Sequence, residues 1–251
     1  MESGMPLTTR FAPSPTGLLH LGHAWSAVQA HDLARTAGGR FILRVEDIDE
    51  TRCRPEFTDA IFRDLVWLGL DWDGPVLIQS ERGALYRAAV QQLAEQGLAY
   101  RCWCTRAEIE EAASAPHDGG PPRYPRTCKH RTQPFPTGPH CWRIDASAAG
   151  APELDDFVIE RKDALSSYML ACTLDDAQQG VTDIVRGVDL EPLTAGQALL
   201  QRVFGWPTPR YHHHPLIGTA AGKRLAKRNK APTLAAMREA GMDGRALAAD
   251  L

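Results

Sequence analysis

Hydrophobic positions in the N-terminal part of the chain change their spacing twice. Residues 7–12 form a short run typical of a strand, residues 22–36 carry apolar side chains at helical spacing, and residues 41–45 form a second apolar strand. The helix is expected to stop at the glycine pair 38–39. This pattern predicts a βαβ unit with parallel strands and a right-handed crossover. Ligands bind at the carboxyl ends of such strands, so the first strand-to-helix turn is a candidate site.

Two further helices continue the first half of the chain. Residues 56–68 and 82–96 are predicted to be helical. Ser80 is the expected N-cap of the second of these helices, and Gly97 is its expected stop. The first half therefore indicates an α/β fold.

The texture changes between residues 100 and 142, where four of the six cysteines lie among many prolines, glycines and charged residues. A packed sheet layer does not have this composition, so the segment indicates an inserted module. Thr105 and Glu108 fit a capping box, which predicts one short helix in a segment that is otherwise loop.

Regular elements return after the insertion. Strand candidates occur within residues 157–190, a helix over 194–205 is expected to stop at Gly205, and residues 210–218 resemble another strand. The predicted organisation has four ranges: 1–99 as the first half of the main domain, 100–150 as the inserted module, 151–217 as the second half, and 218–251 as a loop with a short C-terminal tail.

Composition sets the cellular setting. The chain has 251 residues, 43% hydrophobic and 24% charged, which is enough for a large core with a smaller module. No apolar run approaches the ~20 residues that span a bilayer, so no membrane segment is expected. The net charge of −3 means that an RNA partner would need a local basic surface. Unevenly spaced cysteines in a chain of this length favour a protein of the reducing cytoplasm. The protein is expected to be a monomer.

Two histidines stand at the first strand-to-helix turn, in the order His20-Leu-Gly-His23. Backbone amides and the helix dipole attract phosphate at such a turn, and imidazoles there can donate to phosphate oxygens. Gly22 would let a planar base approach the backbone. The alternative interpretation is two ordinary surface histidines. The segment 218–224 is not a Walker A phosphate-binding loop, because its glycine spacing is wrong and no hydroxyl residue follows its lysine. No Gly-x-Gly-x-x-Gly dinucleotide-binding fingerprint follows the first strand either.

Four segments resemble the signatures of class I aminoacyl-tRNA synthetases, specifically the glutamyl form. "RFAPSPTGLLHLGH" is similar to the HIGH signature, and "LRVEDIDETR" is similar to the segment that follows it. "TDIVRGVDL" and "YHHHPLIGTAAGKRLAKRN" resemble the substrate strand of the second half and the KMSKS loop. The family resemblance implies a Rossmann-type parallel sheet with a small inserted zinc-binding module. It also implies ATP-dependent activation of L-glutamate to glutamyl-adenylate.

The resemblance implies a role in ATP chemistry for both ends of the chain. His20, His23 and Lys227 would be catalytic, because they would hold the phosphates while the carboxylate attacks the α-phosphorus. Arg224 and Ala226 differ from the lysine and serine of the consensus, although Arg224 keeps the charge. Mg²⁺ is expected with the phosphates, without a dedicated protein cage. The implied ATP-binding residues are His20, Gly22, His23, Arg224, Leu225, Ala226, Lys227 and Arg228.

A second implied set surrounds glutamate. A side-chain carboxylate requires a guanidinium, for which Arg10 or Arg186 is suited, and the α-ammonium requires an acid such as Glu46. A guanidinium would also reject glutamine, whose amide presents hydrogens to the same donors. The alternative for each of these residues is an ordinary salt bridge or packing role. The family pattern places Arg10, Ala12, Ser14, Glu46, Tyr168 and Arg186 around the amino acid.

The inserted module carries possible metal ligands. Cys102 and Cys104, followed by Tyr124 and Cys128, would supply soft donors in a segment too poor in apolar residues to hold its own shape. The glutamyl-queuosine branch of the family has similar spacing, which implies one structural Zn²⁺ with tyrosine as the unusual fourth ligand. The long gap before Tyr124 leaves Cys141, His130 or His117 as alternatives to it.

The same branch accounts for the length of the chain. Little sequence follows Lys227, so no anticodon-binding domain is expected. The resemblance then implies tRNA-independent glutamate activation and transfer to the queuosine base at the wobble position of tRNA(Asp). Alternatives are a glutamyl-tRNA synthetase fragment that charges the 3′ end of tRNA(Glu), and a non-catalytic module that binds glutamate or its adenylate. Candidate phosphate contacts are Arg123, Arg126, Lys129 and Arg131, for which a solvated loop is the alternative.

Overall fold

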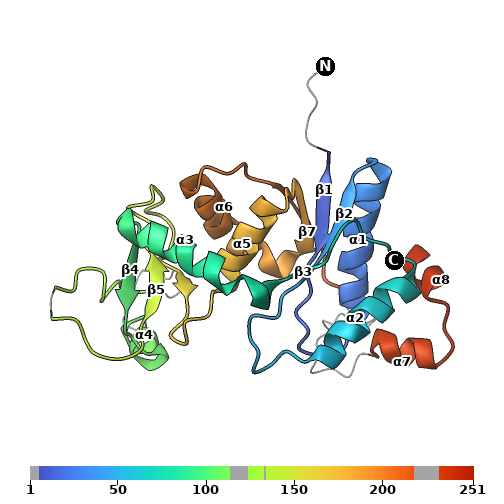
Figure 1. The fold of residues 1–251 in the computed structure, drawn as a ribbon, viewed down its shortest axis with the longest axis horizontal. Coiled ribbons are helices and arrows are strands. Elements are labelled where there is room, and N and C mark those ends of the chain that lie inside the picture. Colours follow the sequence, from blue (N-terminus) through green and yellow to red (C-terminus); the bar gives the residue numbers. More distant parts are fainter. Residues whose placement is uncertain (1–5, 114–123, 133, 218–231) are drawn as a thin grey trace, which may run out of the picture. The chain divides into compact units, whose positions relative to one another are not determined.

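The chain folds as helices and strands in a computed structural model (Figure 1). The residues that the structure describes are 6–113, 124–132, 134–217 and 232–251. Among them, no helix combines the length and the apolar character that crossing a membrane requires.

These residues group into two compact units. The first unit contains the described parts of Met1–Glu81, Gln178–Thr194 and Thr208–Leu251. The second contains those of Arg82–Ala177 and Ala195–Pro207. The predicted insertion, residues 100–150, falls within the second unit.

A parallel sheet forms the centre of the first unit. Its strands are β1 (Thr8–Phe11), β2 (Arg40–Val45), β3 (Leu77–Ile78), β7 (Asp183–Gly187) and β8 (Arg210–His214). The first three pair in the order β1-β2-β3, and β7 pairs with β8, with every pair parallel. The predicted α/β fold with a parallel sheet is therefore confirmed.

The two groups of strands meet between β1 and β7. The Thr182 amide donates to the Thr8 carbonyl at 2.9 Å, and the Thr8 amide donates to Thr182 Oγ1 at 2.8 Å. Arg10 Nη1 donates to the Val185 carbonyl at 3.3 Å. Residues far apart in the sequence therefore come together at the centre of the sheet.

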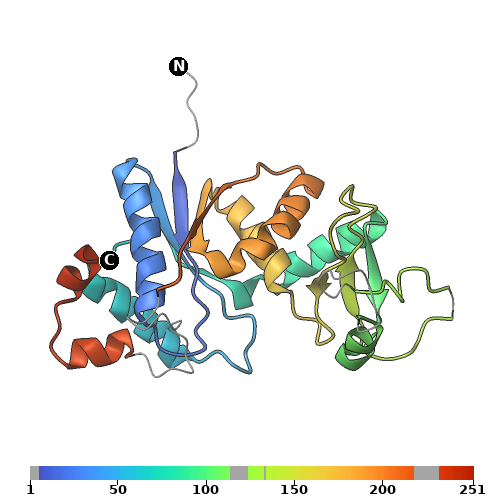
Figure 2. The same ribbon diagram turned by 180° about the vertical axis from the view of Figure 1, so that it is seen from behind.

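Helix α1 (Leu21–Thr36) runs along β1 and β2 (Figure 2). Its buried side chains are small, which permits a close approach: Thr9 Oγ1 on β1 donates to the Ala30 carbonyl at 2.6 Å. The crossover back to the sheet is equally tight, because a Cβ at Gly39 would lie 2.2 Å from the Leu7 carbonyl oxygen. The buried residues of α1 are Ala24, Ala27, Val28, Ala30 and Ala34.

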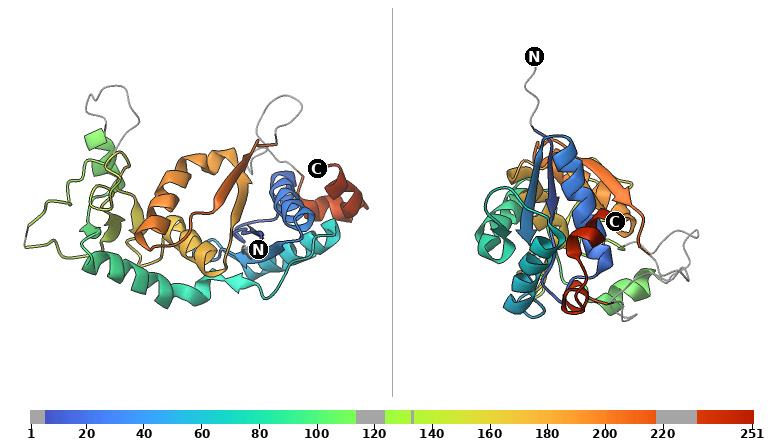
Figure 3. Two further views of the ribbon diagram at one scale, coloured as in Figure 1. Left: turned by 90° about the horizontal axis from the view of Figure 1, so that it is seen from above. Right: turned by 90° about the vertical axis from the view of Figure 1, so that its right-hand side faces the viewer.

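Helix α2 (Pro55–Leu68) lies beside the last two helices, α7 (Leu234–Glu239) and α8 (Gly244–Ala249) (Figure 3). Leu234 is fully buried and joins the hydrophobic core beneath α1. The helix predicted at 56–68 is thus present, whereas the expected short tail contains two helices that complete this core.

The second unit is built on an antiparallel sheet. Strands β4 (Ala99–Cys102), β5 (Cys141–Ile144) and β6 (Val158–Glu160) pair in that order. The unit also contains four helices: α3 (Gly83–Glu95), α4 (Arg106–Ala113), α5 (Tyr168–Gln178) and α6 (Thr194–Val203). The last residue of α5 and the first residue of α6 are assigned to the first unit. Two short 3₁₀ helices lie where the chain passes between units: Gln79–Arg82 and Val188–Leu193.

Of the two helix N-caps predicted from the sequence, one is present and one is not. The capping box is confirmed, since the Glu108 amide donates to Thr105 Oγ1 and the Thr105 amide donates to Glu108 Oε2. The expected Ser80 cap is wrong. Ser80 lies in a 3₁₀ turn, and both its amide and its hydroxyl donate to Asp47, at 2.8 and 2.7 Å. Strands β6 and β7 appear where strands were expected, but helix α5 occupies the segment between them.

Candidate active site and cysteine cluster

The start of α1 is capped by imidazoles. His20 is the N-cap residue, and its Nδ1 accepts a hydrogen bond from the Gly22 amide at 3.1 Å. His23, in the N3 position, accepts from the His20 amide through its own Nδ1 at 3.2 Å. The two side chains thus form a reciprocal capping box, in which histidines replace the usual hydroxyl and carboxyl residues.

This capping fixes which nitrogen of each ring carries the proton. A ring nitrogen that accepts a backbone N–H bond has no proton of its own, so a neutral His20 or His23 is protonated at Nε2. The rings lie with their centroids 3.9 Å apart. Each neutral ring therefore carries its N–H at Nε2, while its Nδ1 atom holds the start of the helix.

Gly22 is explained by this cap. A Cβ at position 22 would lie 3.0 Å from His20 Cε1 and 3.2 Å from His20 Nδ1, closer than ordinary contacts. The glycine therefore makes room for the imidazole that caps it, whereas the sequence suggested that it makes room for a base. The Gly22 amide is also bonded to that ring.

Residues on both sides of the segment 218–231 are attached near the start of α1. Before it, His214 Nε2 lies 2.7 Å from Ser26 Oγ on α1. After it, the Leu234 amide donates to the Leu19 carbonyl at 2.9 Å, and Thr233 forms a β-bridge with His20. Arg224, Leu225, Ala226, Lys227 and Arg228, which the sequence assigns to ATP, lie in this segment and outside the described residues.

Buried charged side chains occupy the sheet face opposite α1. Phe41 and Leu43 of β2 pack in the core with α1, so the alternating residues Ile42 and Arg44 belong to the other face. Arg10 pairs in register with Ile42 and shares that face. Arg10 and Arg44 are 4% and 0% exposed. The first unit thus places two guanidinium groups in its interior.

Arg44 is a residue that the sequence reasoning missed. Its Nε and Nη2 both lie 3.4 Å from Glu46 Oε1, and its Nη1 donates to Gln179 Oε1 at 2.9 Å. Glu46 itself is 9% exposed, and its amide donates to the Pro13 carbonyl. A charged residue two positions before Glu46 on the same strand face was the available signal.

The guanidinium group of Arg186 is hydrogen-bonded to His213. Its Nε lies 3.3 Å from His213 Nε2, and its Nη2 donates to Thr194 Oγ1 at 2.8 Å. Burial, reinforced by the positive charge of Arg186, lowers the pKa of His213. A neutral His213 can accept from the guanidinium, so the pair fixes where Arg186 points. Its neighbours make other contacts, since His212 bonds to Asp183 and His214 to Ser26.

The remaining residues that are predicted to bind the ligand glutamate lie in different parts of the chain. Ala12 and Ser14 follow β1 directly, next to Pro13, whose carbonyl accepts from Glu46. Tyr168 begins α5 in the second unit and is 37% exposed. The structure thus brings Arg10, Ala12, Ser14, Glu46 and Arg186 into one unit, and Tyr168 belongs to the other.

The cysteine cluster is preformed. The Sγ atoms of Cys102, Cys104 and Cys128 all lie within 4.8 Å of one another, and those of Cys104 and Cys128 are 3.5 Å apart. Tyr124 Oη lies 3.0 Å from Cys102 Sγ and 3.7 Å from Cys104 Sγ. A tetrahedral ion about 2.3 Å from each sulfur keeps ligand atoms roughly 3.8 Å apart, so these four residues fit a zinc-sized ion.

The alternatives to Tyr124 are less well placed. Cys141 pairs with Cys102 across β4 and β5 but is not among the three cysteines that group within 4.8 Å, and His130 is exposed. His117 lies outside the described residues. A hydrogen bond from Cys141 is the main reason that the pKa of Cys102 is lowered, with contacts to Tyr124 and Arg143 also contributing. Thiolates are the form that binds metal, so Cys102 is poised as a ligand.

Asp156 anchors the loops around this cluster. It is fully buried, and its Oδ2 accepts from Tyr100 Oη at 2.7 Å and pairs with Arg126 Nε at 3.1 Å. Lys129 is likewise paired, with Asp145 at 2.6 Å. Two of the cations that the sequence offered as RNA contacts are therefore engaged within the unit. Arg131 is exposed, and Arg123 lies outside the described residues.

Comparison with known families places the chain. The family model described as "tRNA synthetases class I (E and Q), catalytic domain" matches residues 6–146 and 142–248. Together these matches cover nearly the whole chain. The family resemblance of the four sequence signatures is thereby confirmed.

Individual relatives agree with this match. The glutamyl-Q tRNA(Asp) synthetase of Rhodobacter capsulatus is 45% identical, with 94% of this chain and 96% of the relative covered. A glutamate–tRNA ligase of Geotalea uraniireducens is 40% identical, and the chain covers 53% of it. Among solved structures, a glutamate tRNA ligase from Elizabethkingia meningosepticum in complex with its amino acid superposes with a TM-score of 0.80 at 27% identity, over 96% of this chain and 59% of that one.

Proposed function

The chain belongs to the glutamyl-Q tRNA(Asp) synthetase family within the class I tRNA synthetases, a family of synthetase-like ligases, and from this premise we propose that it activates L-glutamate with ATP before tRNA binds. The observation that carries the proposal is the imidazole-capped start of α1, which lies in the same unit as the buried residues Arg10, Glu46 and Arg186. A phosphate-binding turn and an acid-binding face are the two parts that adenylate formation needs.

The proposed chemistry is an in-line displacement. The glutamate α-carboxylate attacks the α-phosphorus of ATP, the bond from that phosphorus to the oxygen bridging to the β-phosphate breaks, and pyrophosphate leaves. Mg²⁺, when bound, would supply positive charge to the phosphates. His20 and His23 donate from Nε2 to phosphate oxygens, where negative charge builds up. Because their Nδ1 atoms are engaged in capping, the donors are oriented before the nucleotide arrives.

Lys227 is proposed to neutralise the β- and γ-phosphates. It stands between the tether at His214 and the tether at Leu234, and both tethers are attached near the start of α1. Arg224 and Arg228 would add positive charge, while Gly22, Leu225 and Ala226 would complete the nucleotide site.

Glutamate recognition is proposed to use the buried face of the sheet. Glu46 would accept the α-ammonium group, with its orientation held by Arg44. Arg10 or Arg186 would bind the side-chain carboxylate, because a guanidinium offers paired donors in carboxylate geometry. Glutamine would be rejected, since its amide hydrogens would face N–H donors. Ala12 and Ser14 would line the turn after β1, and the family pattern adds Tyr168 as a further glutamate-binding residue.

Zinc is proposed as a structural ion held by Cys102, Cys104, Tyr124 and Cys128. The fit of the three sulfurs and the phenol to one small ion supports it. When bound, zinc supplies cross-linking of the loops to β4 and takes no part in the displacement. The reaction residues belong to the first unit, apart from Tyr168, whereas the zinc ligands belong to the second.

The acceptor is proposed to be the queuosine base of tRNA(Asp). The support is the similarity to relatives that carry this acceptor in their names, over nearly their full length in the best-covered case. Charging of the 3′ end of tRNA(Glu) is the second candidate, because a glutamate–tRNA ligase is 40% identical to the chain.

Two linked assays test the proposal. The first is glutamate-dependent exchange of pyrophosphate into ATP with no tRNA present, which is expected to proceed, while glutamine is expected to give little signal. The second is transfer of labelled glutamate to tRNA(Asp) with and without queuosine, and to tRNA(Glu). Labelling is expected only with queuosine. Absence of exchange would refute activation, and labelling of tRNA(Glu) would select the second candidate.

A further inference from the structure

A pocket of about 430 Å³ opens beside the cysteine cluster, within the second unit. Its walls include Cys104 and Cys141 together with two aliphatic side chains. Its charged lining is unusual in sign: four cations and one carboxylate, namely Arg106, Arg143, Arg161, Lys162 and Glu110. A concave surface lined mainly by one sign of charge concentrates its electric field and attracts ions of the opposite sign.

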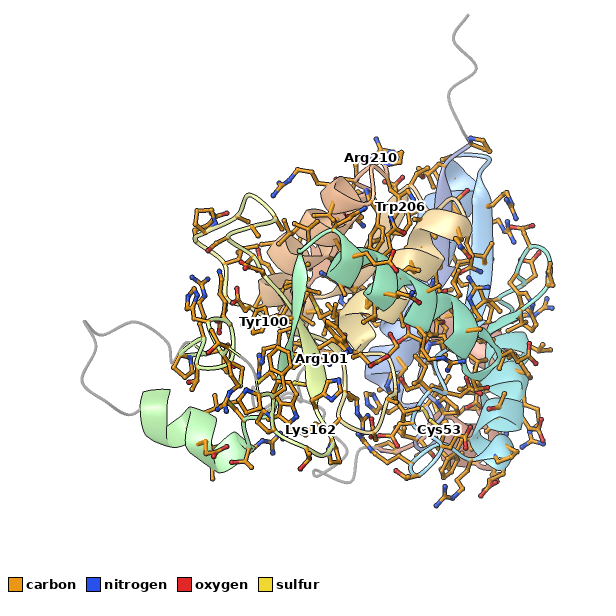
Figure 4. The ribbon with its side chains drawn as sticks, turned by 60° about the vertical axis from the view of Figure 1, so that its left-hand side comes forward. Cys53, Tyr100, Arg101, Lys162, Trp206 and Arg210 are labelled. Atoms are coloured by element: carbon orange, nitrogen blue, oxygen red, sulfur yellow. The ribbon has the colours of Figure 1, made fainter. Side chains whose placement is uncertain are left out.

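The cations enter the pocket from three elements. Arg106 is in the first turn of α4, Arg143 is on β5, and the turn after β6 supplies Arg161 and Lys162, the latter labelled in Figure 4. Arg161 pairs with Asp163 at 2.7 Å, which offsets one charge.

Lys162 is held in this surface by a neutral group. Its Nζ donates to the Trp103 carbonyl at 2.7 Å, a contact with a neutral group that leaves two donors of the ammonium for a ligand. With Arg106 and Arg143, the pocket therefore presents three cations against the single carboxylate of Glu110 once the Arg161–Asp163 pair is set aside.

Arg143 gives the second, independent sign of a ligand. It is 9% exposed, its Nη1 donates to the Asp156 carbonyl at 2.7 Å, and its guanidinium lies 3.8 Å from the centre of the Tyr124 ring. Its Nε is buried with no hydrogen-bond partner among the described residues. A buried donor without an acceptor is destabilising, so a ligand that supplies an oxygen would be favoured.

Charge compensation of a metal cluster does not account for the whole set. A zinc ion with three thiolates carries one net negative charge, which Arg143, in contact with Tyr124 and Cys102, would balance. Arg106 and Lys162 remain on the accessible side of the pocket and are exposed. Their convergence indicates an anion that comes from outside the unit.

We propose that this pocket binds a phosphate group, and that the group belongs to the backbone of the RNA partner. Phosphate matches both the forked donors of arginine and the point charge of lysine. The second half of the proposal rests on the proposed function, which supplies an RNA. The pocket replaces Arg126 and Lys129 as the phosphate contact of this unit, because those two are already paired with Asp156 and Asp145.

The test compares charge-neutral variants of the two exposed cations with a matched control. Arg106→Gln, Lys162→Gln and their combination remove pocket charge, while Arg202→Gln removes an exposed arginine on α6 of the same unit. Binding of a tRNA(Asp) transcript is measured by anisotropy at several salt concentrations. Each pocket variant is expected to bind about threefold more weakly, the pair about tenfold, and the salt slope is expected to fall by roughly 0.7 to 1 per residue.

Controls separate the possible explanations. Metal content and far-UV circular dichroism of each variant establish that the cysteine cluster is intact. An equal loss in Arg202→Gln would show a bulk charge effect and would overturn the proposal. Inorganic phosphate, added at constant ionic strength, is the second arm. Competition by phosphate that the double variant abolishes, without any change in RNA affinity, would support the site and assign it to free phosphate.

Failure of this proposal is distinguishable from failure of the proposed function. Glutamate-dependent pyrophosphate exchange without tRNA does not involve the pocket, so all three pocket variants are expected to retain it. Exchange that persists while RNA and phosphate bind the double variant as tightly as the parent chain would remove the pocket and leave glutamate activation intact.

Discussion

The start of α1 and the cysteine cluster hold their side chains by different means. His20 and His23 are fixed by backbone hydrogen bonds of the helix that they cap, and the neighbouring strands set the position of that helix. The donors of the cluster come from the end of β4 and from loop residues, packed against a small group of partly buried side chains. The scaffold therefore prepares the first site by itself, whereas the donors of the second lie mostly on loops, which the proposed zinc would cross-link.

Removal of metal should break this contrast most strongly. Chelation under reducing conditions, or Cys102→Ser, is expected to abolish hydrogen-exchange protection of β4 and β5 and to leave β1 and β2 protected. The reason is the size of the metal term, about 10 kcal/mol or more of apparent binding free energy for structural zinc.

The matched control for this experiment is Cys172→Ser, a buried cysteine outside the cluster. It is expected to keep full metal content, measured by elemental analysis. Metal content in Cys102→Ser equal to that of the parent chain would contradict the ligand assignment.

The two functions of the imidazoles can be separated by substitution. His20→Asn and His23→Gln preserve a capping acceptor but remove the Nε2–H donor. Each is expected to slow pyrophosphate exchange about 100-fold or more, with unfolding free energy unchanged within about 0.5 kcal/mol.

Alanine at the same positions sharpens the separation. His20→Ala is expected to lose the donor and the cap together, with a further cost of about 1 kcal/mol in the unfolding free energy. Denaturant titration beside the exchange assay measures both quantities. Exchange at the parental rate in His23→Gln would exclude that ring from the chemistry.

Acid should loosen the arginine that a histidine holds. The pKa of His213 is lowered by burial and by Arg186, so the folded chain keeps this ring neutral at pH values where the unfolded chain protonates it. Its stabilising contribution is therefore complete above the ordinary pKa of 6.5 and is lost as the pH falls through the folded value.

This titration predicts a pH profile. A protonated His213 cannot accept from Arg186, so the KM for glutamate is expected to rise several-fold as the pH falls below 6.5 and through the lowered pKa of His213, with a smaller change in the KM for ATP. His213→Gln retains an acceptor that does not titrate and is expected to flatten the glutamate profile. An acid-induced rise that persists unchanged in this variant would exclude His213 as its cause.

The elements around the first site were readable from the sequence because their period is strong. Apolar spacing predicted β1, α1 and β2, and glycines marked the crossover. Helix α5 was missed because its stretch is apolar on most sides: Leu170, Ala171, Cys172 and Leu174 are all buried, so no single face announces a helix.

Partnerships between distant residues were beyond the sequence. Arg44 meets Gln179, and Arg186 meets His213, only once the parallel strands are in register. The same limit applies to Arg126, whose ion pair with Asp156 removes it from the exposed cations. Residue type and spacing identified candidates, and the register of the strands decided which of them are already occupied.

The first unit is assembled from distant segments of the sequence, which affects the order in which the two units can fold during synthesis. Its sheet and core take β1 from the beginning of the sequence and Leu234 from near the end, and the Leu234 amide bonds to the Leu19 carbonyl. More than two hundred residues are synthesised between β1 and Leu234. Most of the second unit, in contrast, is one continuous stretch, Arg82–Ala177. The cysteine module is therefore synthesised while the sheet of the first unit is still incomplete.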